Sequence, residues 1–172
     1  MSNDVILMPH NPQWAEIFEA ESAMVMAAVG DNAIAIHHIG STAIALVVAK
    51  PIIDMLMVVQ HIEDMDSRNG ELEKLGYEAK GEFAIPQRRY FRKNNASGER
   101  TFHLHVYATG SHQITRHLAF RDYLRSHAEL AAEYSNLKLM LARQYPHSSP
   151  SYIDGKGPFI RKIDELAAKS PQ

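Results

Sequence analysis

Two stretches decide the fold of this chain, HHIGST at residues 37–42 and IIDMLMVV at residues 52–59. The first continues an apolar run and reads as a buried strand that ends at a Gly-Ser-Thr corner. The second is apolar almost throughout and is typical of a central strand. Asp54 interrupts it, and a carboxylate is unfavourable to bury unless it is paired, hydrogen-bonded or bound to a cation. We therefore expect the chemistry of this protein where the corner and Asp54 meet.

Further strands and helices are expected around these two stretches. The other predicted strands cover residues 77–80, 87–92 and 101–108. The predicted helices cover residues 12–29, 62–75, 112–126, 128–144 and 156–168, with a loop at 146–150. Strands dominate the middle of the chain and helices both ends. This order predicts an α/β (α+β) fold, a small mixed β-sheet flanked by helices with a helical C-terminal third, in a single domain over residues 1–172.

Composition and charge restrict the class of partner. The 172 residues are 45% hydrophobic and 22% charged, as in globular proteins, and include no cysteine, which removes disulfides and thiolate chemistry. The net charge of -2 argues against general nucleic-acid binding. No apolar run is long enough to span a membrane, and residues 1–4 show no signal peptide. We expect a cytoplasmic protein that binds a small molecule, with its oligomeric state left open.

The corner itself predicts a phosphate site. A strand that runs into Gly40, Ser41 and Thr42 and then a helix presents backbone N–H groups and hydroxyls to an anion. An ordinary strand–turn–helix corner, with the hydroxyls as helix caps, is the alternative. Cations that could neutralise a phosphate are found at Lys50, Arg89, Arg92, Lys93 and Lys156. The basic stretch 88–93 could equally be a charged edge strand that resists aggregation, and Lys50 could simply pair with Asp54.

Two histidines are expected to join Asp54. Alternation along residues 101–107 places His103 and His105 on one strand face. Two imidazoles at this spacing can ligate one metal ion, hydrogen-bond a phosphate or exchange a proton, whereas a solvated sheet face produces the same pattern by default. We predict that Asp54, His103 and His105 form a catalytic or metal-binding group.

Several motifs, in order along nearly the whole chain, carry a family resemblance. They are HIGSTA at 38–43, AKPIID at 49–54, RYFRK at 89–93, HLHV at 103–106, HLAFRDYL at 117–124 and YIDGK at 152–156. With these motifs the chain resembles the GrpB (UPF0157-type) family, which is assigned to the nucleotidyltransferase superfamily. The resemblance implies that superfamily's small mixed sheet, with Gly40 and Ser41 facing phosphate. It also implies binding of a nucleotide or other phosphorylated small molecule, and transfer of a nucleotidyl or phosphoryl group to a small acceptor.

The sequence departs from the superfamily pattern in its metal ligands. Active nucleotidyltransferases usually hold a divalent metal ion with an Asp-x-Asp/Glu pair and a third carboxylate. Here Leu56 occupies the second position of that pair, two residues after Asp54, and His103 and His105 stand on the later strand. One carboxylate and two imidazoles suit Mg²⁺ poorly and Mn²⁺, Ni²⁺ or Zn²⁺ better, so the identity of an expected metal ion is open. Ala45 and Leu46 also replace the family's usual Pro-Gly. The alternatives are a catalytically degenerate module that binds a nucleotide or coenzyme, and a partner-binding module that uses the C-terminal helices.

Overall fold

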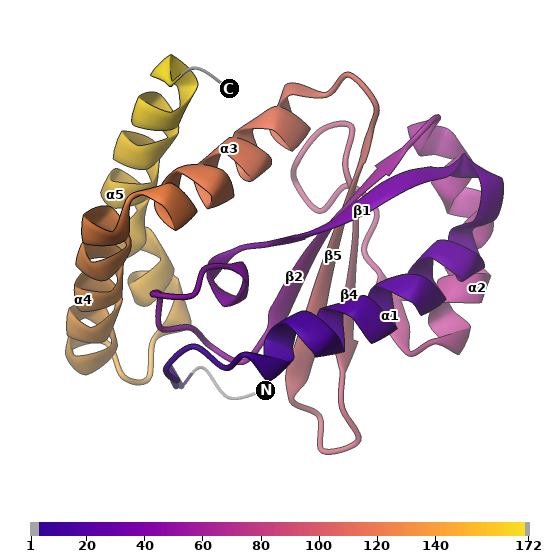
Figure 1. The fold of residues 1–172 in the computed structure, drawn as a ribbon. Coiled ribbons are helices and arrows are strands. Elements are labelled where there is room, and N and C mark those ends of the chain that lie inside the picture. Colours follow the sequence, from indigo (N-terminus) through magenta and orange to yellow (C-terminus); the bar gives the residue numbers. More distant parts are fainter. Residues whose placement is uncertain (1–3, 171–172) are drawn as a thin grey trace.

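A computed structural model describes residues 4–170 of the chain and shows a five-stranded sheet with helices around it (Figure 1). The strands are β1 (Ala33–Ile39), β2 (Ile53–Val59), β3 (Tyr77–Ala79), β4 (Arg89–Asn94) and β5 (Arg100–Ala108). The α-helices are α1 (Gln13–Val29), α2 (Asn69–Lys74), α3 (His112–Ser126), α4 (Ala128–Gln144) and α5 (Ser149–Lys169). Short 3₁₀ segments are η1 (Gly30–Asn32), η2 (Ser41–Ala43) and η3 (Ile62–Arg68). The expectation about residues 1–4 falls almost wholly outside the described part.

The sheet is mixed, as expected from the sequence, with the strand order β1-β2-β5-β4-β3. Its central strands β2 and β5 run parallel, and the other neighbours are antiparallel. The β2–β5 register sets Asp54 beside His103, and the β1–β2 register sets Ile39 opposite Asp54. Strands far apart in the sequence therefore bring the expected site residues to one place in the sheet.

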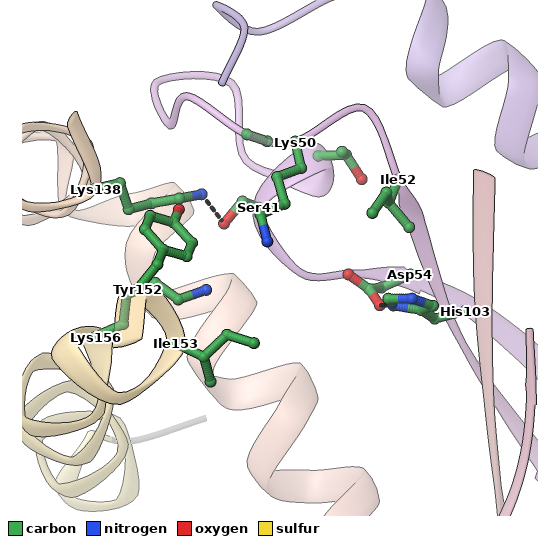
Figure 2. A pocket seen from close by; sticks show the side chains of 11 residues that line it. Ser41, Lys50, Ile52, Asp54, His103, Lys138, Tyr152, Ile153 and Lys156 are labelled. Carbon is green, nitrogen blue, oxygen red and sulfur yellow. Dashed lines mark hydrogen bonds and ion pairs between the residues drawn. The ribbon is translucent and has the colours of Figure 1, made fainter. Parts of the chain in front are cut away.

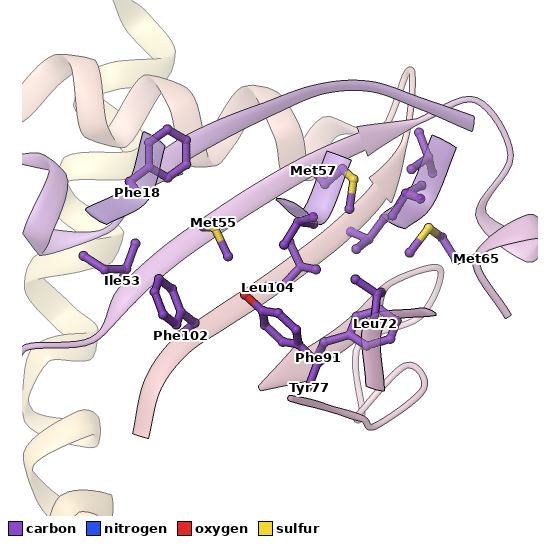
Figure 3. Packing of buried hydrophobic residues seen from close by; sticks show 14 of the residues in the cluster. Phe18, Ile53, Met55, Met57, Met65, Leu72, Tyr77, Phe91, Phe102 and Leu104 are labelled. Atoms are coloured by element: carbon purple, nitrogen blue, oxygen red, sulfur yellow. The ribbon is translucent and has the colours of Figure 1, made fainter. Parts of the chain in front are cut away.

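Alternate residues of the central strands face two different layers. The face toward α1 and α2 carries the larger apolar core (Figure 3). Its sheet residues include Ile53, Met55, Met57, Phe91, Phe102, Leu104 and Val106. On the opposite face Leu56 and Tyr107 pack with Ile39 and with side chains of α3. Asp54 lies on this second face, because it is two residues from Leu56 on the same strand.

The helices of the C-terminal third form a layer of their own beside this second face. Helices α3, α4 and α5 pack on one another through side chains such as Tyr134, Phe159 and Ile163. Ile44 and Val47, from the loop after the Gly-Ser corner, are buried in the same cluster. The loop thus ties the helical layer to the end of β1, and the site lies between the two. No helix within residues 4–170 combines the length and apolar character that a bilayer crossing demands.

Two expected helices are shorter or differently wound than predicted. Residues 41–43 form only the 3₁₀ turn η2, and the chain then becomes extended at Ile44, so the corner does not open a helix. Residues 62–68 are also 3₁₀, which leaves α2 as a single short helix. Gly70 and the polar residues around it disfavour a long α-helix in this segment.

The last helix begins earlier than predicted, and residues 149–155 are helical rather than a loop. The Ser148 hydroxyl accepts a hydrogen bond from the Ser151 amide at 3.4 Å. Pro150 lies in the first turn, where its missing N–H costs no helical hydrogen bond because first-turn N–H groups have no acceptor within the helix. Gly155 lies within this helix and serves packing. A Cβ built there would lie 2.5 Å from the Leu141 Cδ2 atom, so the glycine lets α5 approach α4 closely.

The core assignment predicts how strongly one side chain stabilises the fold. Leu104 is fully buried between β2 and β4, so Leu104→Ala should lower the free energy of unfolding by about 2–5 kcal/mol. Leu139→Ala is the matched control, because that side chain is 38% exposed. Urea unfolding followed by circular dichroism measures both, and similar losses in the two variants would contradict the assignment.

Candidate phosphate-binding site

Asp54 is held by two imidazoles at the start of β2. Its Oδ1 atom lies 3.0 Å from His103 Nδ1 and 3.5 Å from His105 Nε2. Burial alone would raise the pKa of Asp54, but the hydrogen bonds from His103 and His105 outweigh it and hold that pKa well below its usual range. The carboxylate is therefore ionised, and its hydrogen-bond partners are these histidines rather than Lys50.

Each of the two imidazoles also meets an arginine. Arg100 Nη1 lies 3.4 Å from His103 Nε2, and Arg88 Nη1 lies 3.3 Å from His105 Nδ1. Both arginines extend the group around Asp54, and neither was predicted as a site residue. The signal that could have found Arg88 is weak, because it is one of several basic residues in a row.

The Gly-Ser corner closes directly over the carboxylate. Gly40 has φ +74°, and a Cβ built there would lie 2.8 Å from Asp54 Oδ2 and 3.2 Å from Asp54 Cβ. A side chain at this position would displace the carboxylate. Thr42 is buried, and its hydroxyl hydrogen-bonds with His38 Nε2 at 2.8 Å, so it is engaged within the fold. Burial lowers the pKa of His38 to about 4, which keeps that imidazole neutral.

Three lysines converge beside the corner, and we call the cavity they line the three-lysine pocket. It has a volume of about 240 Å³ and is lined by Lys50, Lys138 and Lys156 together with Ser41 and Asp54. Figure 2 shows the lysines of α4 and α5 on one side and the Asp54–His103 pair on the other. Lys138 Nζ donates to Ser41 Oγ at 2.7 Å and to the Val48 carbonyl.

The pocket holds cationic groups without carboxylate partners. Burial, together with the nearby charge of Lys156, lowers the pKa of Lys138 to about 6. Burial and the charge of Lys50 lower the pKa of Lys156 to about 8. No carboxylate within residues 4–170 forms an ion pair with any of the three lysines.

An aromatic ring completes the wall of this pocket. The amines of Lys50 and Lys156 lie 4.9 and 4.7 Å from the centre of the Tyr152 ring. The Tyr152 hydroxyl is buried and has no hydrogen-bond partner among the described residues. A buried hydroxyl without a partner in the wall of a cationic cavity is consistent with a polar ligand or water there.

A second cavity of about 290 Å³ adjoins the first and shares Ser41, Asp54 and Lys156 with it. Phe120 and Ile160 make part of its wall apolar, whereas Arg116 and His117 supply polar groups. Burial, reinforced by the charge of Arg116, lowers the pKa of His117 to about 3, so its imidazole is neutral. Asp54 therefore lies between two compartments of different chemistry.

Three of the predicted phosphate-binding cations line neither cavity. Arg89 pairs with Asp66 at 2.8 Å, Arg92 with Glu78 at 3.0 Å and Lys93 with Glu21 at 3.0 Å. These pairs support the interpretation of β4 as a charged strand, but its expected place at the edge of the sheet is wrong, because β4 lies between β5 and β3. The structure does bring together most of the other predicted site residues, namely Gly40, Ser41, Lys50, Asp54, His103, His105 and Lys156.

Lys138 is the main residue that sequence reasoning missed. It is only 2% exposed and lies on the buried stripe of α4 with Ala131, Tyr134 and Leu141. Spacings of three and four residues place all four on one helix face. A lysine on an otherwise buried helical stripe is the signal that could have revealed it.

The arrangement of Asp54, His103 and His105 does not fit a metal ion as it stands. Among residues 4–170, no group of three or more His, Cys, Asp or Glu side chains is placed to hold one. His103 Nδ1 forms a hydrogen bond with Asp54, His105 Nε2 lies 3.5 Å from it, and the set lacks the oxygen ligands that Mg²⁺ prefers. The divalent metal ion expected from the sequence stays a prediction.

The fold resembles that of the nucleotidyltransferase Cid1. The structure of the Cid1 poly(U) polymerase in complex with its product ApU matches with a TM-score of 0.55 and 14% sequence identity. The match covers 87% of this chain and 48% of Cid1. At this identity the similarity concerns the fold alone, and it confirms the expected sheet and helical layer.

The family assignment is more specific. A family model described as GrpB protein matches residues 4–166, and the chain belongs to the GrpB family. The crystal structure of the conserved protein GrpB from Enterococcus faecalis matches with a TM-score of 0.91 and 41% identity, over 95% of this chain and 98% of that one.

Sequence similarity to two bacterial proteins supports the family assignment. The UPF0157 protein YqkA of Bacillus subtilis (strain 168) is 45% identical over 96% of this chain, which spans about half of YqkA (48%). The glutamate-rich protein GrpB of Alkalihalophilus pseudofirmus is 33% identical over 93% of this chain and 94% of its own length. The resemblance drawn from the motifs is confirmed.

The close approach at the corner predicts the effect of one methyl group. Gly40→Ala should lower the free energy of unfolding by roughly 1–3 kcal/mol, since the new Cβ would strain the backbone and contact Asp54. Gly81→Ala is the matched control, because Gly81 also has positive φ but nothing lies within 4 Å of its built Cβ. Urea unfolding compares the two; equal losses would show that the contact with Asp54 does not matter.

The buried amine of Lys138 predicts a pH dependence of stability. Its pKa is about 6 in the folded protein against 10.5 ordinarily, so between these values only the unfolded chain carries the proton. The stability of the natural protein relative to Lys138→Met should therefore rise with pH over this window, by at most about 1.4 kcal/mol per pH unit. Urea unfolding of both proteins at several pH values measures this difference. A difference that stays constant with pH would contradict the buried, deprotonated amine.

Proposed function

We propose that this chain binds the phosphates of a nucleotide, or of another phosphorylated small molecule, in the three-lysine pocket. The observation that carries the proposal is the convergence of Lys50, Lys138 and Lys156, none of them paired with a carboxylate, on one pocket that Ser41 also lines. Amines crowded together in a partly buried cavity repel one another, and a bound anion would relieve that repulsion.

The local geometry suits a phosphate better than a carboxylate. Four donor groups line the cavity: three amines and the hydroxyl of Ser41. A phosphate offers several charged oxygens and can accept from all of them at once. The neighbouring Asp54 is ionised and would repel a ligand placed directly against it, so the phosphates belong on the lysine side.

The fold similarity supports a nucleotide among the phosphorylated candidates. Crystal structures of Cid1 contain MgGTP or the UTP analogue UMPNPP, and these chains match the present fold with TM-scores of 0.53 and 0.51. Because the sequence identity is 14%, these ligands belong to Cid1, and for this chain they only suggest which compounds to test.

The second cavity supports transfer of a group to an acceptor. In this hypothesis a nucleotide lies in the three-lysine pocket and a small hydroxyl or amine compound lies in the cavity beside Arg116 and Phe120. The acceptor oxygen or nitrogen bonds to the α-phosphorus while the bond to the β-phosphate oxygen breaks, so pyrophosphate leaves. Asp54 Oδ2, which accepts no hydrogen bond from residues 4–170, takes the proton from the acceptor.

Two observations favour binding without chemistry as the alternative function. Leu56, at the position of the usual second carboxylate, is fully buried against Ile39 and Tyr107, so no acidic group faces the site there. The lowered pKa of Asp54 also makes this carboxylate a weak base. Incubation with nucleoside triphosphates and small hydroxyl compounds, followed by assay of released pyrophosphate, distinguishes the two. Pyrophosphate release lost in Asp54→Asn supports transfer, whereas ligand binding without product supports the binding module.

Phosphate binding itself is tested most directly with pyrophosphate in isothermal titration calorimetry. Lys156→Met and Lys138→Met should each weaken binding on the order of tenfold or more, because the first removes a cation and the second an amine N–H donor from the lining of the pocket. Affinity should also fall as the pH rises through about 8, where Lys156 loses its proton. Lys162→Met is the matched control on α5, since Lys162 is exposed and pairs with Glu133. Unchanged affinity in both pocket variants would rule out this pocket.

A further inference from the structure

We propose that Asp54, His103 and His105 form a metal-independent group, in which Arg88 and Arg100 fix the tautomers of both imidazoles so that each turns an N–H toward the carboxylate. The inference deepens the proposed function. Only its pyrophosphate-binding test rests on that function, whereas the tautomer and metal tests do not. It assigns Arg88 and Arg100 as positioning residues, because they act on Asp54 through the histidines.

The direction of each hydrogen bond follows from the chemistry of arginine. A guanidinium group can only donate, so the imidazole nitrogen that faces it must accept and carries no proton. Arg100 faces His103 Nε2, which places the proton of His103 on Nδ1, the atom 3.0 Å from Asp54. The tautomer of His103 is thereby determined by its two neighbours.

In His105 the two ring nitrogens exchange roles, and again an N–H faces Asp54. Arg88 faces its Nδ1 atom, which places the proton on Nε2, the atom 3.5 Å from Asp54 Oδ1. Two rings two residues apart on β5 therefore present different nitrogens to one carboxylate oxygen. Asp54 Oδ2 lies against Gly40 and faces neither of these two imidazole nitrogens.

This arrangement leaves no imidazole lone pair for a metal ion. A neutral imidazole binds a metal through its unprotonated nitrogen, and in both rings that nitrogen accepts from an arginine. The two guanidinium groups also supply positive charge beside the carboxylate, which is what a metal ion would otherwise do. A cation that approached would be repelled by both.

The arginines are held in place by further bonds. Arg88 is 7% exposed, and it donates to the carbonyls of Glu82 at 3.2 Å and Phe83 at 2.9 Å. Arg100 Nε donates to Asn94 Oδ1 at 2.7 Å. Neither guanidinium group can turn aside for a metal without breaking these contacts.

The first test reads the tautomers and metal binding of the natural protein. Long-range ¹H–¹⁵N spectra should show the proton of His103 on Nδ1 and that of His105 on Nε2. Titration with Mg²⁺, Mn²⁺, Ni²⁺ and Zn²⁺ should leave both side-chain spectra unchanged. Pyrophosphate should bind equally well with EDTA and with added Mg²⁺.

The second test removes the arginines. Arg88→Met and Arg100→Met each free one imidazole nitrogen, so we expect Zn²⁺ or Ni²⁺ affinity to increase roughly tenfold or more in the double variant. Arg92→Met is the matched control, because Arg92 lies on β4 but pairs with Glu78 instead of an imidazole. Circular dichroism establishes whether the variants fold. If a variant does not fold, the ¹H–¹⁵N spectra of the natural protein still test the proposal.

Three outcomes would overturn the proposal: reversed tautomers, a metal ion bound by His103 or His105 in the natural protein, or pyrophosphate binding that requires a metal. Failure of pyrophosphate to bind under any condition would instead refute the proposed function. The tautomers and the metal titrations would still decide the present inference in that case.

Discussion

The ionised carboxylate of Asp54 inside the fold is the constraint on which the site depends. A carboxylate at this depth needs compensation, and here N–H donors on the neighbouring strand provide it. Those donors reach Asp54 only because β2 and β5 pair in parallel with His103 beside Asp54. The corner at Gly40 can then close over the same carboxylate because it has no side chain.

The opposite wall of the site has a different origin. Its lysines come from α4, α5 and the loop before β2, and they face the strands only because Ile44 and Val47 are buried among the C-terminal helices. Burying Lys138 and Lys156 without carboxylates opposes stability, as their lowered pKa values indicate. Unfavourable charge kept inside a well-packed fold is typical of a functional site.

Charge is divided between the two walls in an orderly way. The strands carry the carboxylate with its histidines and arginines, and the helices carry the free amines. A ligand with negative charge at one end and a neutral group at the other would match the two adjoining cavities. The exposed apolar side chain of Ile153 lines the first cavity, so its exposure belongs to this site rather than to a docking surface.

Much of this could be predicted from the sequence, because the relevant signals are local. The apolar run at residues 52–59 and the alternation at residues 101–107 predicted two strands and the grouping of Asp54 with both histidines. Apolar spacing predicted α1, α3 and α4 almost to their ends. The prediction failed at the start of α5, where Gly155 permits close packing against Leu141 instead of breaking the helix.

Only the tertiary structure decided which cations serve the site. Arg89, Arg92 and Lys93 looked as suitable as Lys50 and Lys156, but acidic residues distant in the sequence neutralise the first three. The roles of Lys138 and Arg88 are set by contacts with Ser41 and His105, which lie 97 and 17 residues away in the sequence. The sequence by itself determined the residue types and strand faces, since these depend on neighbours along the chain. Whether a cationic side chain is free to bind a ligand depends on the acidic residues that the fold brings next to it.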